Sequence, residues 1–120
     1  MKQVEFRQKE VKPRYEVLVG DKSFKIITNN WYIISLAMKE IEAAEREGGI
    51  SGFTHTMKAL EYIYGAEQLK EIGESDVVED WTEFINFSIS IATGMTPEEY
   101  YAEKEKAVEE SADEKKDQEA

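Results

Sequence analysis

The sequence predicts a small, mainly α-helical domain with an N-terminal β-hairpin and an acidic, partly disordered C-terminal tail. Three observations lead to this fold class. Apolar residues recur at helical spacing in about four segments, two alternating segments flank a Gly-Asp pair, and over half of the net charge of −11 follows Pro97. The 120 residues suffice for one domain with its own core. We therefore divide the chain into an arm or edge strand (1–13), one helical domain with the hairpin (14–101) and an acidic helical or disordered tail (102–120).

The hairpin is predicted before the first helix. Apolar side chains have the period of two that strands require at Tyr15, Val17, Val19, Phe24 and Ile26. Gly20 and Asp21, between the two runs, are typical of a tight turn. Because a two-stranded hairpin is marginal alone in water, its apolar face is expected to pack on the helices that follow.

Three helices are expected next. The first covers residues 31–47, where large apolar residues recur at helical spacing; two asparagines can cap its start, and a Gly-Gly pair ends it. The second covers residues 52–64 and is capped by Ser51. A short third helix covers residues 66–72. These segments supply most of the predicted core.

A fourth helix is predicted after Ser75 or Asp76, with Glu79 completing a capping box. Its apolar face consists of Val77, Trp81, Phe84, Ile85, Ser88 and Ala92. Thr96, followed by proline, then has the pattern of an N-cap that starts another helix. Beyond about residue 109 too few apolar groups remain to hold the tail in place.

The sequence offers little for catalysis. It contains one histidine, His55, and no cysteine, and it lacks calcium-loop, zinc-protease and phosphate-loop motifs. Its carboxylates fall mostly on faces that are predicted to be solvated, whereas a catalytic pair needs one member with a pKa raised by burial. We expect no enzyme, no catalytic residue, no cofactor and no metal site, and a structural or solvated role for His55.

The charge indicates which partners to expect. A net charge of −11 repels nucleic-acid phosphates and anionic lipids, and no apolar run approaches the roughly 20 residues of a membrane span. The partner is therefore expected to be a protein rather than a nucleic acid or a membrane. Tyr32, Ile33, Phe87 and Ile91 lie outside the main helical stripes. They can complete the core, but such surplus in a small chain also indicates a face for self-association or for a partner.

The order of the segments "YEVLVGDKSFKI", "TNNWYIISLAMKEIEAAER", a middle helix pair and "DWTEFINFSISIATGMTPEEYY" resembles the tail assembly chaperones of long, non-contractile-tailed bacteriophages. The resemblance covers about residues 15–101. It implies a helical protein of the host bacterial cytoplasm that keeps the hydrophobic tape measure protein soluble until the tail tube assembles, and that is absent from the mature virion. It also implies a homo-oligomer, as a ring or spiral.

Within this resemblance, the surplus apolar residues become candidates for a groove that binds the tape measure protein: Trp31, Tyr32, Ile34, Met38, Phe84, Phe87 and Ile91. The family commonly makes a second, frameshift-extended product, and Lys115 and Lys116 can be encoded by the adenine run on which ribosomes slip. A Lys-Lys pair is equally ordinary in an acidic tail. The competing hypothesis is an acidic nucleic-acid mimic or small adaptor that inhibits a host DNA-binding enzyme, which would explain the charge.

Overall fold

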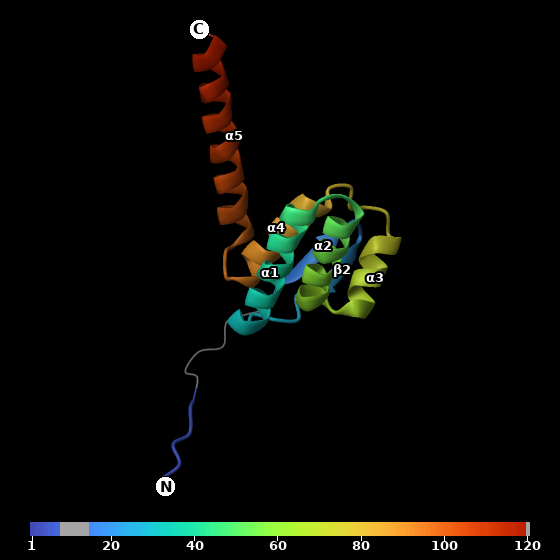
Figure 1. Cartoon of the computed structure of the whole chain (residues 1–120), viewed down its shortest axis with the longest axis vertical. Coiled ribbons are helices and arrows are strands. Elements are labelled where there is room, and N and C mark those ends of the chain that lie inside the picture. The colour runs from blue at the N-terminus through green and yellow to red at the C-terminus, as the bar shows by residue number, and fades with distance from the viewer. Residues whose placement is uncertain (8–14, 120) are drawn as a thin grey trace.

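The computed structural model describes residues 1–7 and 15–119, with side chains described as far as Ser111. Two strands precede five helices along the chain (Figure 1). They are β1 (Glu16–Val19), β2 (Lys22–Lys25), α1 (Trp31–Glu47), α2 (Gly49–Tyr64), α3 (Ala66–Glu74), α4 (Trp81–Ala92) and α5 (Pro97–Glu119). The predicted fold class, mainly helical with an N-terminal hairpin, is confirmed.

β1 and β2 form an antiparallel hairpin in which Val19 is paired with Lys22, so the turn is the predicted Gly20 and Asp21. Gly20 has φ of +65°, and a Cβ there would lie 3.1 Å from Cγ2 of Val77. Glycine therefore serves both the turn conformation and the close approach of a later loop. The strands bury the side chains that alternation predicted, namely Val17, Val19, Phe24 and Ile26.

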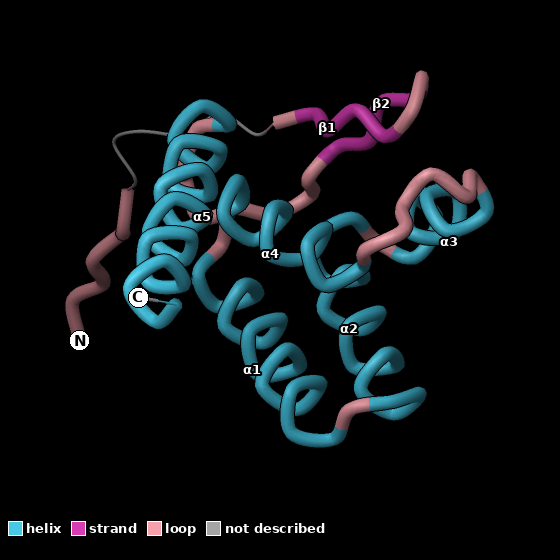
Figure 2. Tube along the Cα trace, turned by 90° about the horizontal axis from the view of Figure 1, so that it is seen from above, coloured by secondary structure: helices cyan, strands magenta, loops and turns pink. Residues whose placement is uncertain are grey.

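The hairpin and the first four helices pack around one core. Figure 2 shows α1 and α2 side by side as an antiparallel pair, with α4 between α1 and the hairpin. The largest fully buried side chains come from the hairpin and from all of the first four helices, so one core joins every element except α5. They are Phe24, Ile34, Leu60, Ile63, Tyr64, Ile72, Ile85 and Ser88.

Two of the predicted helix starts are wrong. α2 begins at Gly49, so Ser51 lies within its first turn, where its hydroxyl donates to Glu47 Oε2 at 2.6 Å. α4 begins at Trp81, and its cap is Asp80, whose Oδ1 accepts from the Glu83 N–H at 3.0 Å. Ser75 instead ends α3. The chain between α3 and α4 turns at Ser75 and Asp76, where Asp76 has a φ of 57°, and Val77 then lies against the hairpin turn at Gly20. This tertiary contact overrides the local capping pattern.

The first and last helices start as predicted. Asn30 Oδ1 accepts from the Tyr32 N–H at 2.9 Å, and Thr96 Oγ1 accepts from the Glu99 N–H at 3.2 Å. α5 projects away from the body (Figure 1), and its helix reaches Glu119, past the point at which we expected order to end. Among the described residues, no helix has both the length and the apolar character needed to cross a membrane.

Candidate functional site

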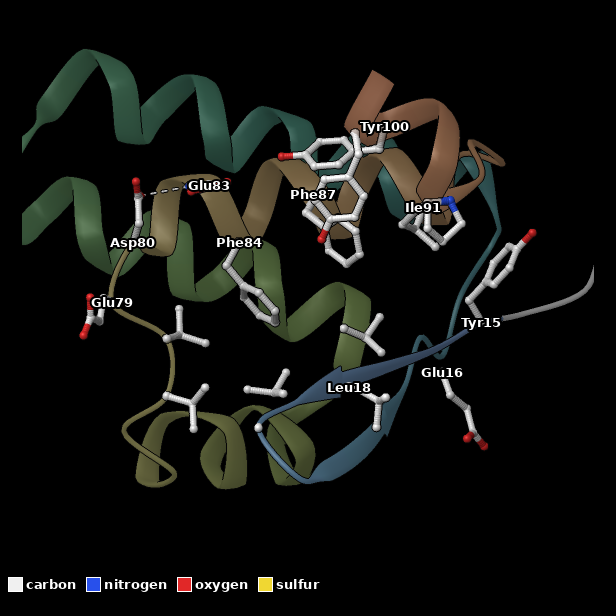
Figure 3. A pocket seen from close by; sticks show the side chains of 17 residues that line it. Tyr15, Glu16, Leu18, Glu79, Asp80, Glu83, Phe84, Phe87, Ile91 and Tyr100 are labelled. Atoms are coloured by element: carbon white, nitrogen blue, oxygen red, sulfur yellow. Dashed lines mark hydrogen bonds between the residues drawn. The ribbon is translucent and has the colours of Figure 1, made fainter. Parts of the chain in front are cut away.

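An apolar groove of about 510 Å³ lies between β1 on one side and α4 with the start of α5 on the other (Figure 3). Phe84, Phe87 and Ile91 of α4 form its floor. Residues 15–20 form one wall, the other wall is Pro97, Tyr100 and Tyr101, and residues 77–80 close one end. We call this hollow the β1–α4 groove.

Aromatic packing fixes the floor of the β1–α4 groove. The Phe84 ring is stacked on Tyr64 with centroids 5.6 Å apart, and Phe87 meets Tyr100 edge to face at 5.1 Å. Tyr101 tilts over Phe87 at 6.0 Å. The capped start of α5 causes this arrangement, because it returns two successive tyrosines onto the last turns of α4. Burial, with smaller contributions from Tyr101 and Asp80, raises the pKa of Tyr100.

The rim of the groove is acidic. Glu16, Glu79, Asp80 and Glu83 are among its lining residues, and none of the described residues that line it is a lysine, arginine or histidine. Glu83 is paired with Lys104 of α5, which leaves the remaining three carboxylates as the local excess of charge. An apolar segment that carries positive charge beside it would therefore suit this site better than an acidic one.

The two edges of the hairpin differ in accessibility. On β2, the Gln68 side chain of α3 accepts from the Lys25 N–H at 2.8 Å and donates to the Lys25 carbonyl at 2.7 Å. These are the bonds that a neighbouring strand would make, so Gln68 covers the β2 edge. Nothing equivalent joins the outer edge of β1 within the described part of the chain.

The direction of the backbone groups on β1 follows from the register. The Tyr15 carbonyl accepts from the Ile26 N–H at 3.1 Å, and backbone groups alternate in direction along an antiparallel strand. Val17 and Val19 therefore bond to β2, whereas Glu16 and Leu18 direct their N–H and C=O groups outward. Both residues line the groove. An open strand edge thus runs beside an apolar floor.

The seven residues predicted to line a binding groove fall in three places. Phe84, Phe87 and Ile91 are brought together in the β1–α4 groove, where Ile91 is only 3% exposed. Trp31, Tyr32 and Met38 are exposed on α1, away from this groove. The prediction for Ile34 is wrong: it is completely buried in the core and offers no surface to a partner. Lys115 and Lys116 lie outside the residues whose side chains are described.

The groove also contains residues that sequence reasoning did not select. Leu18 is 74% exposed although it belongs to a strand, and Tyr100 and Tyr101 come from α5. The two tyrosines could have been predicted from Thr96 and Pro97. A helix that begins at Pro97 places them about one turn later, on the side that faces α4. Leu18 is an apolar residue at a position of β1 where the alternation calls for a polar one, and this was the signal in the sequence that could have identified it.

His55 connects α2 with α1 instead of forming part of the groove. Its Nδ1 lies 2.6 Å from Glu40 Oε2, and its Nε2 lies 2.7 Å from Glu47 Oε2. The hydrogen bond from the Ser51 hydroxyl lowers the pKa of Glu47; burial opposes this, and His55 and Arg46 lower the pKa further. This cluster fixes the helix pair. Among the described residues, no group of three histidine, aspartate or glutamate side chains could hold a metal ion.

Comparison with known proteins adds no relative: no family model matches the chain, and neither the curated proteins nor the solved structures contain a match.

Proposed function

We propose that this protein is a chaperone that binds extended, apolar segments of another protein in the β1–α4 groove. The observation that carries the proposal is the open edge of β1 alongside the aromatic floor of α4. An incoming strand would bond to the outward groups of Glu16 and Leu18 and lay alternate side chains over Phe84 and Phe87. Main-chain bonds give such a site tolerance of sequence, which suits a long client.

The resemblance of the sequence supports naming the client as the tape measure protein of a long, non-contractile-tailed phage. A groove of this size can hold only a short stretch, so a long client needs many copies. Weak contacts become strong when the copies are arrayed and stay releasable one by one. The strongly negative surface keeps the loaded complex from aggregating.

The same resemblance supports further parts of the proposal. The chaperone acts in the cytoplasm of the host bacterium, assembles with itself along the client, and leaves before the virion is complete. A second product, whose extension begins with a frameshift near Lys115 and Lys116, would contain the same groove. Reading the nucleotides that encode these lysines, and the reading frame after them, tests the last point directly.

The test is co-expression with the tape measure protein of the same genome, followed by measurement of the client that remains soluble. Leu18→Asp introduces a charge beside the floor at an exposed position, so folding should be retained. We expect the client that co-purifies to fall at least about tenfold, for which a loss of about 1.4 kcal/mol is enough. Ile50→Asp is the matched control, because Ile50 is also largely exposed, at 87% against 74% for Leu18, but does not line the groove.

Two results would overturn the proposal. If wild type fails to retain the tape measure protein in solution, the client is wrong. If wild type and Leu18→Asp retain equal amounts, the β1–α4 groove is not the binding site. Helical circular dichroism of both variants verifies that the fold is intact.

One observation favours a second candidate function, the nucleic-acid mimic. Every α5 side chain from 101 to 111 is exposed, and this stretch contains four glutamates and two lysines. The helix therefore presents an elongated surface of net negative charge. This part of α5 could occupy the basic groove of a host DNA-binding enzyme. Binding through α5 would weaken strongly with added salt, whereas binding through the apolar groove would change little.

A further inference from the structure

We propose that the arm formed by residues 1–7 of a second copy of this chain occupies the β1–α4 groove, pairing with β1 as an added strand. This inference concerns the protein without its client: the arm would cover the groove until a client strand replaces it. It rests on three properties of the arm that match the groove: its apolar side chains, its charge and its length.

The arm has apolar side chains with nothing to cover them. Val4 is 94% exposed and Phe6 is 88% exposed, and both lie in a segment without helix or strand. In an extended chain these two residues point to one face, and Glu5 and Arg7 point to the other. Arg7 Nη2 does lie 3.2 Å from Glu5 Oε2, as that alternation requires. The arm therefore presents one apolar face of strand type, suited to the floor of Phe84 and Phe87.

The charges of the arm and the groove are opposite. The arm contains Lys2, Glu5 and Arg7, a formal charge of +1, and residues 1–14 as a whole carry +3 in a chain whose total is −11. The groove is rimmed by Glu16, Glu79 and Asp80 and has no basic residue among those lining it. The one basic segment of an acidic protein thus matches its acidic, apolar hollow. Complementary charge favours this orientation and accelerates encounter.

The length and the backbone also match. β1 has four residues, and so does the stretch 4–7; each spans about 13 Å when extended. The outward N–H and C=O groups of Glu16 and Leu18 are available to such a strand. Gln68 already blocks the equivalent groups of Lys25 on β2. The hairpin can therefore be extended by a third strand at β1 and not at β2.

A second copy, rather than the same chain, is the occupant that the arrangement favours. The arm leads away from the body, and its N-terminus lies far from the helical domain (Figure 1). In this structure the arm does not lie in the groove of its own chain, which leaves that groove open to the arm of a neighbouring copy. Arm and groove are different surfaces, so the contact is head-to-tail and propagates into a ring or an open chain.

The experiment uses the absence of cysteine, which makes any introduced pair unambiguous. One preparation carries Glu5→Cys and another carries Leu18→Cys, both exposed and both on the face of the paired strands that points away from the floor of the groove. The two are mixed at high protein concentration, oxidised mildly and separated on a non-reducing gel. Cysteines held side by side react at a high effective concentration, so we expect at least about tenfold more mixed dimer than when Glu5→Cys is combined with Ile50→Cys. Ile50 is exposed but does not line the groove.

A chain carrying both Glu5→Cys and Leu18→Cys separates the two possible sources of the arm. Exchange between copies predicts dimers and larger species joined by disulfides. Cross-linked monomers alone, at every concentration, would show that the arm folds onto its own groove and would overturn the proposal. Equal yields with Leu18→Cys and Ile50→Cys would overturn it as well. No client is present, so neither outcome tests whether the tape measure protein is the client.

Discussion

The hydroxyl oxygen of Tyr64 lies 2.7 Å from Oγ of Ser88, in the buried interface between α2 and α4. The Ser88 hydroxyl donates its own proton to the Phe84 carbonyl at 2.8 Å, so the Tyr64 hydroxyl is the donor between the two side chains. The Tyr64 ring also stacks on Phe84. This pair therefore holds the floor of the β1–α4 groove from below.

Removing the two hydroxyls should have unequal costs. Ser88→Ala leaves the buried Tyr64 hydroxyl without its acceptor and should lower the free energy of unfolding by about 1–3 kcal/mol. Tyr64→Phe leaves the Ser88 bond to Phe84 intact and should cost only about 1 kcal/mol. Urea denaturation measures both. Tyr62→Phe, on an exposed ring of the same helix, is the control and should change little. A larger loss for Tyr64→Phe than for Ser88→Ala would contradict the donor assignment.

Tyr64 should also make stability depend on pH in the alkaline range. Burial raises the pKa of Tyr64 to about 12, against an opposing effect of the Ser88 hydrogen bond. Since the folded-state pKa lies above the unfolded value near 10, its contribution is complete below about pH 10 and is lost between about pH 10 and 12. The loss approaches about 3 kcal/mol, because one pKa unit corresponds to about 1.4 kcal/mol.

The variant Tyr64→Phe isolates this effect, because it lacks the ionisable group and keeps the ring. Wild type should be the more stable protein at neutral pH and should lose that advantage as the pH rises above about 10. Urea denaturation of both proteins at a series of alkaline pH values gives the difference. If the difference stays constant across the series, the hydroxyl of Tyr64 is not buried as the structure places it.

The parts of the fold that follow from local chemistry could be predicted from the sequence. The period of two in the hairpin and its Gly-Asp turn gave the pairing of Val19 with Lys22. The first helix has the predicted bounds, 31–47, because Asn30 at its start and Gly48 at its end act through their own backbone neighbours. The start of α5 is equally local, since Thr96 caps it directly.

The parts that depend on distant contacts could not be predicted. The start of α4 shifts because Val77 crosses the turn at Gly20, and no local pattern announces a contact between those two residues. Phe87 and Ile91, which lie outside the main stripe of α4, indicated a binding face, but the opposite wall of the groove is the edge of β1. That edge is open, whereas Gln68 of α3 covers the edge of β2. A helix pattern alone contains neither fact.

Gln68 should protect the β2 edge in a measurable way. Its amide makes two bonds to Lys25 and donates a third, at 2.7 Å, to the Tyr64 carbonyl. Gln68→Ala should lower the free energy of unfolding by about 1–2 kcal/mol and speed hydrogen exchange at the Lys25 amide. Gln68→Glu should cost more, because a carboxylate cannot donate to the two carbonyls. Glu67→Ala, the exposed neighbour, is the control. Unchanged exchange at Lys25 in Gln68→Ala would contradict this role.

Replacing either of two helical glycines with alanine should change the free energy of unfolding, in opposite directions for the two. A Cβ at Gly52 of α2 would lie 2.7 Å from the Ala44 carbonyl oxygen of α1, a backbone atom that cannot move without separating the helices. Gly52→Ala should therefore lower the free energy of unfolding by about 1–3 kcal/mol. Gly73 of α3 has no atom within 4 Å of the same position, so Gly73→Ala should stabilise the fold, by up to about 1 kcal/mol. Thermal denaturation compares them directly. Stabilisation by both changes would mean that α1 and α2 do not approach as closely as the position of Ala44 requires.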